Sequence, residues 1–159
     1  MRNWRRRLAI VAVLAVLAIV AIYIFRGIPS VVATALRDAD SFELLSLDPK
    51  QDRHDAGFHR FKVLGRTTLT DPSTRKRIYR SLQSGARWNL PFAAMCFTPR
   101  HGLRVIADGR TFDLVICFEC SQVKVWQDDT FMTRFIVGQS PEPAFDQALR
   151  DAGLPLAPK

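Results

Sequence analysis

Acidic residues are missing from the first part of this 159-residue chain, and their absence divides its charge unevenly. Residues 1–26 contain five arginines and no Asp or Glu, so residues 27–159 hold 18 basic and 15 acidic side chains, a net of +3 out of +8 for the whole chain. Much of the positive charge therefore belongs to a short amino-terminal segment. The remainder has too small an excess of Lys and Arg to favour nucleic acid as a partner.

Cysteine is also scarce, with three in the chain, at Cys96, Cys117 and Cys120. An odd number leaves one thiol unpaired in any scheme of internal disulfides. The chain has no internal repeat, and its one low-complexity segment is an apolar run near the amino terminus. No cysteine lies near the end of that run, which excludes a lipoprotein anchor. The length fits one compact domain with an accessory segment.

The apolar run extends without a charge from Leu8 to Phe25. At about 1.5 Å per residue it would form roughly 27 Å of helix, which predicts a transmembrane anchor over residues 8–25. Four arginines precede the run and only Arg26 follows it, which predicts a cytoplasmic stub over residues 1–7 and an extracytoplasmic remainder. The alternative is a signal peptide cleaved near Ala35.

We therefore expect a single-pass protein of the bacterial inner membrane, with a signal anchor, a cytoplasmic amino terminus and the lipid bilayer as a partner through residues 8–25. Residues 26–40 are expected to form a stalk or first helix. Residues 41–157 are expected to form one extracytoplasmic α+β domain. The sequence identifies no protein partner.

Alternating or helical apolar patterns give the elements of that domain. Strands are predicted at residues 41–49, 58–69, 93–99 and 131–137, and helices at residues 71–85 and 140–153. With the central hairpin described next, these elements predict a mainly antiparallel sheet of about five to six strands with two to three helices. The polar segment that contains His54 and His59 is predicted to be a solvated loop.

The central hairpin is predicted from Asp108-Gly109, a strong signal for a two-residue turn. Such a turn places Arg104 opposite Asp113, a favourable charge pair across the strands, and His101 opposite Ile116. The second strand is expected to continue through Cys120. After that residue the apolar positions change parity, which predicts a bulge or bend before Val123.

Cys117 and Cys120 have the C-x-x-C spacing of redox pairs and of metal sites. Three residues apart in a regular strand, their Cα atoms would lie about 10 Å apart, whereas a disulfide needs about 4.4–6.8 Å. The motif CFEC contains neither Gly nor Pro to break the strand, which disfavours a self-contained redox pair. A disulfide from Cys96 to either cysteine and buried, unligated thiols stay open as alternatives.

Cys96, His101, Cys117 and Cys120 together form the pattern C-x4-H-x15-C-x2-C, which is close to the spacing of zinc sites. These four residues are the predicted metal ligands, and zinc is the candidate cofactor. A cysteine nucleophile with His101 as base lacks an identifiable third residue or oxyanion element. No catalytic residue and no other cofactor-binding residue is therefore predicted.

The segments SLDP, LGRTTL, CFTPRHGLRV, DLVICFEC and AGLPL lie within residues 41–157. They resemble a group of small bacterial exported or membrane-anchored proteins that are usually called uncharacterised. The blocks CF-PRHG and CFEC carry most of the resemblance. It implies a bacterial, extracytoplasmic setting and transfers no catalytic role to this chain.

The function that these observations favour is a membrane-anchored extracytoplasmic binding or structural module of unknown ligand, stabilised by a Cys/His metal site or a disulfide, and not an enzyme. The alternative is a thiol-redox or metal-dependent enzyme that uses the same Cys96, His101, Cys117 and Cys120. Counting free thiols and measuring bound metal would separate the two hypotheses.

Overall fold

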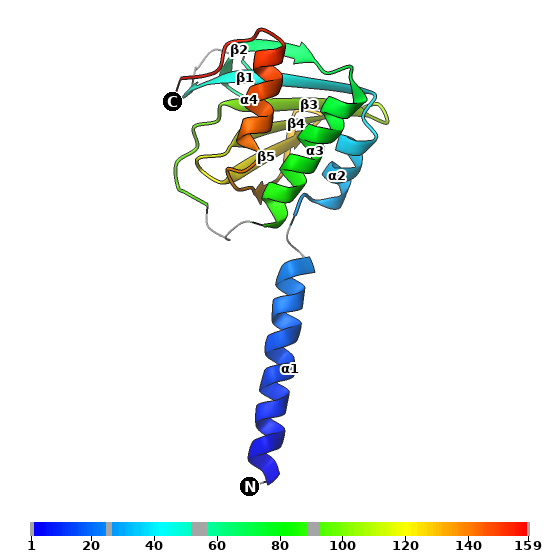
Figure 1. Cartoon of the computed structure of the whole chain (residues 1–159), viewed down its shortest axis with the longest axis vertical. Coiled ribbons are helices and arrows are strands. Elements are labelled where there is room, and N and C mark those ends of the chain that lie inside the picture. Colours follow the sequence, from blue (N-terminus) through cyan, green and yellow to red (C-terminus); the bar gives the residue numbers. More distant parts are fainter. Residues whose placement is uncertain (1, 25–26, 52–56, 89–92, 159) are drawn as a thin grey trace.

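The computed structural model describes residues 2–24, 27–51, 57–88 and 93–158. Four helices and six strands occur in these ranges (Figure 1). In chain order they are α1 (Arg2–Ile24), α2 (Ser30–Arg37), β1 (Ser41–Gln51), β2 (Phe61–Thr68), α3 (Pro72–Arg87), β3 (His101–Ala107), β4 (Arg110–Cys117), β5 (Gln122–Gln127), β6 (Thr130–Ile136) and α4 (Glu142–Asp151).

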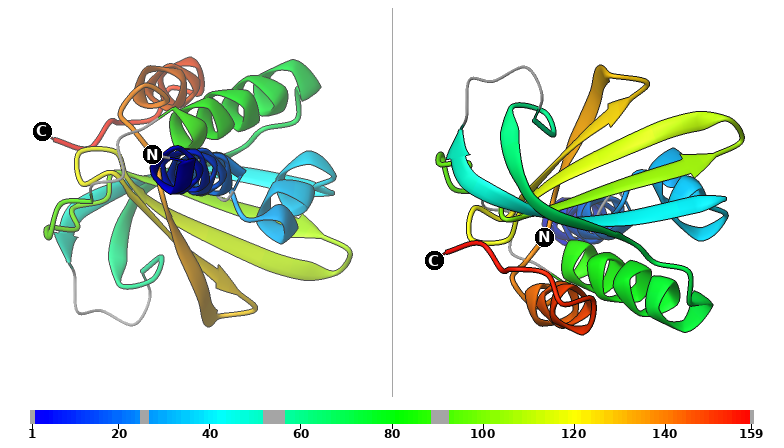
Figure 2. Two further views of the ribbon diagram at one scale, coloured as in Figure 1. Left: turned by 90° about the horizontal axis from the view of Figure 1, so that it is seen from below. Right: turned by 90° about the horizontal axis from the view of Figure 1, so that it is seen from above.

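The six strands form one antiparallel sheet in the order β2-β1-β3-β4-β5-β6. Both views of Figure 2 show α3 and α4 on the same side of this sheet. The helix α2 packs beside α3 and touches β3, and it occupies the segment predicted to be a stalk or first helix. The predicted α+β class and mainly antiparallel sheet are therefore confirmed.

The two faces of the sheet bury different groups. One row across the sheet, which includes Leu44, Leu103, Leu114 and Val125, belongs to the main core under the helices, so we call this side the helix face. The neighbouring residues in each strand point to the other side, the open face. There a smaller apolar cluster forms from Leu45, Leu47, Phe58, Phe61 and Val115.

The helix α3 begins as the sequence predicts. The carboxylate of Asp71 accepts hydrogen bonds from the backbone N–H groups of Ser73 and Thr74 and from their hydroxyls, and the side-chain bond from Ser73 is the main reason that the pKa of Asp71 is lowered. The predicted stop at Gly85 is wrong, because the helix continues to Arg87. Gly85 lies against Pro141, where a Cβ atom would clash, so this glycine permits close packing.

The helix α1 stands apart from the domain, and its side chains from Leu8 to Leu17 are exposed (Figure 1). No helix in the described residues is long and apolar enough to cross a membrane. The predicted transmembrane signal anchor over residues 8–25 is therefore wrong, and so is the location in the bacterial inner membrane. The described helix, Arg2–Ile24, also takes in the four arginines that precede the apolar run, so its first turns are not apolar.

The predicted central hairpin is confirmed, since Ala107 pairs with Arg110, Arg104 with Asp113, and His101 with Ile116. Two neighbouring predictions are wrong. Residues 93–99 form no strand. The second strand of the hairpin does not continue to Cys120 but ends at Cys117, and a turn leads into β5.

Candidate functional site

The turn between β4 and β5 brings the two cysteines of CFEC together. The backbone N–H of Ser121 donates to the carbonyl of Phe118 over 3.1 Å, and Ser121 adopts a positive φ of 55°. This left-handed residue reverses the chain without Gly or Pro. The Cα atoms of Cys117 and Cys120 are consequently 5.2 Å apart, and the two residues form a disulfide. The expectation that a strand separates them is wrong.

The third cysteine lies against this turn. The backbone N–H of Ala94 donates to the carbonyl of Cys120 over 3.0 Å, and the guanidinium of Arg100 donates to the carboxylate of Glu119 over 2.6 Å. These two bonds hold the segment 94–100 beside the turn. The Sγ atom of Cys96 lies 3.3 Å from Sγ of Cys120. We call Cys96, Cys117 and Cys120 the sulfur cluster.

The three sulfurs differ in their access to solvent. The residues Cys117 and Cys120 are 1% and 0% exposed, whereas Cys96 is exposed and carries the free thiol. In the described part of the chain, Cys96 is thus the solvent-facing member of the cluster. A reagent dissolved in water would meet this thiol before it met the disulfide.

Hydrogen-bond donors surround the buried sulfurs. The backbone N–H of Cys120 donates to Sγ of Cys117 over 3.1 Å, and the backbone N–H of Thr98 donates to Sγ of Cys120 over 3.4 Å. The hydroxyl of Thr98 lies 3.9 Å from Sγ of Cys117 and 3.6 Å from Sγ of Cys120. Donors of this kind stabilise a thiolate relative to a thiol. The cluster can therefore accept negative charge on sulfur.

A hollow of about 650 Å³ adjoins Cys96 on the open face, and Lys124 and Arg134 line it. The ammonium of Lys124 lies 3.8 Å from the centre of the Phe97 ring, a cation–π contact. Burial and the neighbouring charge of Arg134 lower the pKa of Lys124. An exposed thiol and two basic side chains therefore line the same hollow.

The structure does not bring His101 to the cysteines. This residue is 3% exposed on the helix face, its Nε2 atom lies 2.9 Å from Oδ1 of Asp146, and the rings of Phe118 and Phe145 pack around it. Within the described ranges, no group of three or more His, Cys, Asp or Glu side chains could hold a metal ion. Zinc bound by Cys96, His101, Cys117 and Cys120 stays a prediction.

A second polar group on the open face was only half predicted. The guanidinium of Arg104 donates to both oxygens of Asp113, over 2.7 and 2.6 Å, as the predicted charge pair requires. The Nε2 atom of His59 lies 2.8 Å from the same carboxylate. The indole of Trp126 stacks on the imidazole of His59, with 4.0 Å between the ring centres. We call His59, Arg104 and Asp113 the charge cluster. Placing His59 in a solvated loop was wrong, and His54 lies outside the described residues.

A tight turn places His59 over the sheet. Phe58 and Phe61 exchange two backbone hydrogen bonds, and both residues between them have positive φ, 50° for His59 and 76° for Arg60. Phe58 and Phe61 are buried, which fixes this turn on the open face. These two aromatic residues were the one signal in the sequence that the loop is anchored.

Burial alone would raise the pKa of Asp113, but the hydrogen bonds from Arg104 and His59 outweigh it and lower that pKa below its ordinary value. The hydrogen bond between Arg104 and Asp113 also raises the pKa of Arg104. The charge cluster therefore holds an ionised carboxylate that is 2% exposed.

Comparison with known proteins adds no relative to this picture, since the chain matches no protein-family profile, no curated protein and no solved structure.

Proposed function

We propose that the sulfur cluster is a thiol–disulfide exchange site, in which exposed Cys96 connects the buried Cys117–Cys120 pair with external thiols and disulfides. The observation that carries this proposal is the distance of 3.3 Å between Sγ of Cys96 and Sγ of Cys120. Reacting atoms in a near-attack arrangement lie about 3–3.5 Å apart. The Cys117–Cys120 disulfide is buried, so a partner in solvent would exchange first with Cys96.

The internal step is an attack of the Cys96 thiolate on Sγ of Cys120. A bond forms between Cys96 and Cys120, the bond between Cys117 and Cys120 breaks, and the electron pair leaves on Sγ of Cys117. The N–H of Cys120 and the hydroxyl of Thr98 face that leaving sulfur, which favours its thiolate form. The step exchanges one disulfide for another and needs no external oxidant.

The external steps follow the same chemistry. In the reduced protein, the thiolate of Cys96 attacks a substrate disulfide and releases one substrate thiol. The Cys120 thiolate then attacks Sγ of Cys96 and releases the second substrate thiol, and Cys117 finally displaces Cys96 from Cys120. Two protein thiols lose two electrons and become a disulfide, while one substrate disulfide becomes two thiols. The reverse sequence oxidises a substrate dithiol.

A purely structural role explains the cluster less well. A disulfide between residues three apart closes a very short loop, for which the chain-entropy relation gives about 2 kcal/mol of stabilisation. Such a role also gives no reason for a third sulfur beside the pair. The hollow lined by Lys124 and Arg134 favours partners that carry carboxylates near their sulfur, such as small acidic thiols.

The proposal is tested by mixing reduced protein with one equivalent of 5,5′-dithiobis(2-nitrobenzoate) and following release of the coloured thiolate. The wild-type chain should release two thiolates per reagent molecule and finish with a Cys117–Cys120 disulfide. The variant Cys96→Ser should form that disulfide at least about tenfold more slowly, because its remaining thiols are buried.

Equal rates in the wild-type chain and in Cys96→Ser would refute the proposal. The proposal would also be refuted if reduced protein purified without added metal held about one zinc per chain and its thiols reacted only after chelation. The sulfurs would then be metal ligands. Circular dichroism of both proteins checks that the variant is folded.

A further inference from the structure

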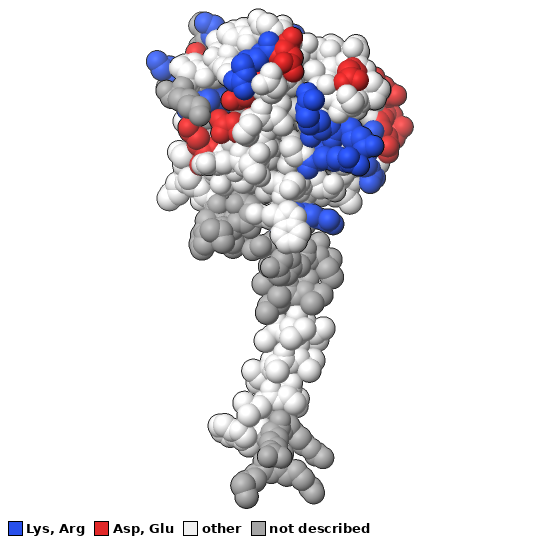
Figure 3. Space-filling model, viewed as in Figure 1, with Lys and Arg blue, Asp and Glu red and all other residues white. Residues whose placement is uncertain are grey.

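A groove of about 510 Å³ lies between α2 and α3, away from the sulfur cluster. Its size is within the range of about 300–1,000 Å³ that small-molecule sites occupy. Leu36, Ala39, Pro72 and the ring of Tyr79 supply an apolar surface, and four basic side chains complete the lining. Figure 3 shows the basic residues as a continuous area over these helices.

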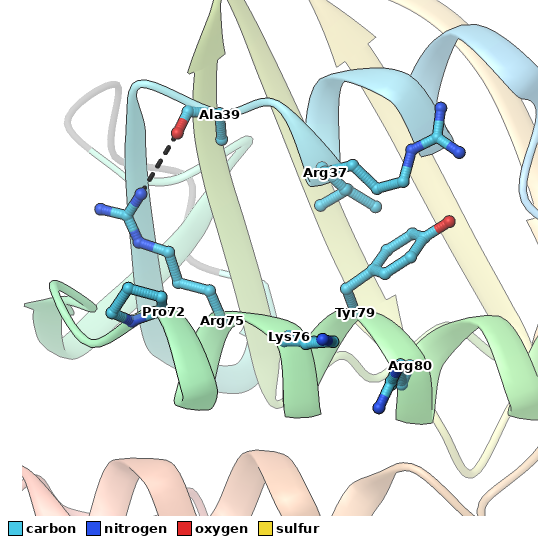
Figure 4. A pocket seen from close by; sticks show the side chains of 8 residues that line it. Arg37, Ala39, Pro72, Arg75, Lys76, Tyr79 and Arg80 are labelled. Carbon is cyan, nitrogen blue, oxygen red and sulfur yellow. Dashed lines mark hydrogen bonds between the residues drawn. The ribbon is translucent and has the colours of Figure 1, made fainter.

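One of the four basic residues holds the wall of the groove in place. The guanidinium of Arg75 donates to the backbone carbonyl of Leu69 and, over 3.2 Å, to that of Ala39 (Figure 4). These bonds tie α3 to the segment that leads from α2 into β1. The groove therefore keeps its shape without a ligand, which lowers the cost of binding one.

The other three cations, Arg37, Lys76 and Arg80, have no carboxylate partner among the described residues. Lys76 and Arg80 are four residues apart on one helix, where like charges repel each other. Among the described residues, the guanidinium of Arg37 donates to the hydroxyl of Thr34, over 3.2 Å. This arrangement of like charges is unfavourable by itself, and a bound anion would relieve it.

The aromatic residue of the groove lies among these cations. In Figure 4 the side chain of Tyr79 extends from α3 toward Arg37 on α2, with its hydroxyl at the outer end. The ring packs on the edge of the main core, and the hydroxyl makes no hydrogen bond to a described residue. A flat apolar group could lie on this ring while an attached anion reaches the basic side chains.

We infer that the groove binds a small phosphate monoester whose organic part is a flat ring. The phosphate would lie between Lys76 and Arg80 with Arg37 opposite, and the ring would contact Tyr79. This site is independent of the exchange chemistry proposed above, because the groove contains no cysteine. Either proposal can fail while the other stands.

The test is calorimetric titration of the full chain with three probes: phenyl phosphate, inorganic phosphate and phenol. Phenyl phosphate should bind at least about tenfold more tightly than inorganic phosphate, since it adds contact with Tyr79, and phenol should not bind measurably. Lys76→Gln and Arg80→Gln should each weaken phenyl phosphate about tenfold, because each removes a charge-assisted contact. Tyr79→Leu should remove the preference for phenyl phosphate over inorganic phosphate.

The matched control is Arg77→Gln, which removes a charge from the same helix at a residue that does not line the groove. It should leave the affinity for phenyl phosphate within about twofold of the wild-type value. Equal weakening by Arg77→Gln and Arg80→Gln, or equal affinity for inorganic phosphate and phenyl phosphate, would overturn the inference. Either result would mean that the basic side chains attract anions without forming a site.

Discussion

The sulfur cluster and the charge cluster lie on the same open face of the sheet, and both are held by a short segment that folds over the strands. In the charge cluster the central carboxylate of Asp113 is buried and bonded on both oxygens. In the sulfur cluster two buried atoms adjoin a third that is exposed. The same architecture thus produces a closed structural group and an accessible reactive one.

This difference indicates which of the two clusters is able to react. A buried charge with every partner in place stabilises the chain and has nothing to exchange. A buried disulfide with an exposed thiol 3.3 Å from one of its sulfurs can undergo exchange, and the exposed thiol makes it accessible to reagents in solvent. Changes in the charge cluster should therefore alter mainly stability, and changes in the sulfur cluster mainly reactivity.

The largest effect on stability is expected from Arg104→Met. This variant keeps most of the aliphatic packing but leaves the buried carboxylate of Asp113 with His59 alone, which should cost about 3–5 kcal/mol of unfolding free energy. Urea unfolding followed by circular dichroism measures the change. The control is Arg66→Met, since Arg66 is exposed and lies 3.9 Å from Glu43, so this pair should contribute less than about 1 kcal/mol. A loss below about 1 kcal/mol for Arg104→Met would contradict the role of the charge cluster.

A smaller effect is expected on lowering the pH. Because the pKa of Asp113 is lower in the folded chain than in the unfolded one, its contribution to stability is complete above the unfolded value of about 3.9 and is lost as the pH falls through the folded pKa. The unfolding free energy between pH 6 and pH 2.5 should therefore fall more steeply for wild-type protein than for Asp113→Asn. Parallel curves would count against an ionised Asp113 in the folded state.

The disulfide should contribute less to stability than the charge cluster does. The double variant Cys117→Ser/Cys120→Ser should lose about 2 kcal/mol of unfolding free energy relative to the oxidised protein, the value expected for so short a loop. Chemical denaturation without reductant measures this loss. If the variant instead lost more than about 4 kcal/mol, the bond would be chiefly structural and the proposed division between the clusters would fail.

The smallest change in stability is expected from Cys96→Ser. An exposed side chain away from a cap or a buried network usually contributes within about 0.5 kcal/mol, so the unfolding free energy should stay close to that of the wild-type chain. Thermal unfolding of the two proteins side by side is sufficient to compare them. Destabilisation by more than about 1 kcal/mol would indicate that Cys96 supports the fold rather than exchange.

Much of the sheet could be predicted because its signals are local. The dipeptide Asp108-Gly109 fixed the central hairpin, and the pairing of Arg104 with Asp113 agreed with its register. The apolar alternation of the strands and the cap at Asp71 gave the correct class and most of the remaining elements. In each case the residues that determine the conformation lie within a few positions of each other.

The errors at both clusters share a physical cause. The turns that place His59 and Cys120 depend on left-handed backbone at residues other than glycine, namely at His59, Arg60 and Ser121. Tertiary packing stabilises these conformations, and the residue types alone do not predict them. A strand was therefore expected through Cys120, and His59 was expected in solvent. A disulfide between Cys96 and Cys120 was among the alternatives from the sequence. That alternative placed Cys96 in a strand at residues 93–99, which the fold does not contain.

The most direct test of the exchange site is disulfide mapping in the single variants Cys117→Ser and Cys120→Ser. Each variant is oxidised under native conditions with glutathione disulfide, alkylated to trap free thiols, digested and analysed by mass spectrometry. We expect Cys117→Ser to form a Cys96–Cys120 disulfide and Cys120→Ser to form no bond between Cys96 and Cys117. Failure of Cys96 and Cys120 to pair in Cys117→Ser, or the same extent of pairing in both variants, would contradict the proposed exchange site.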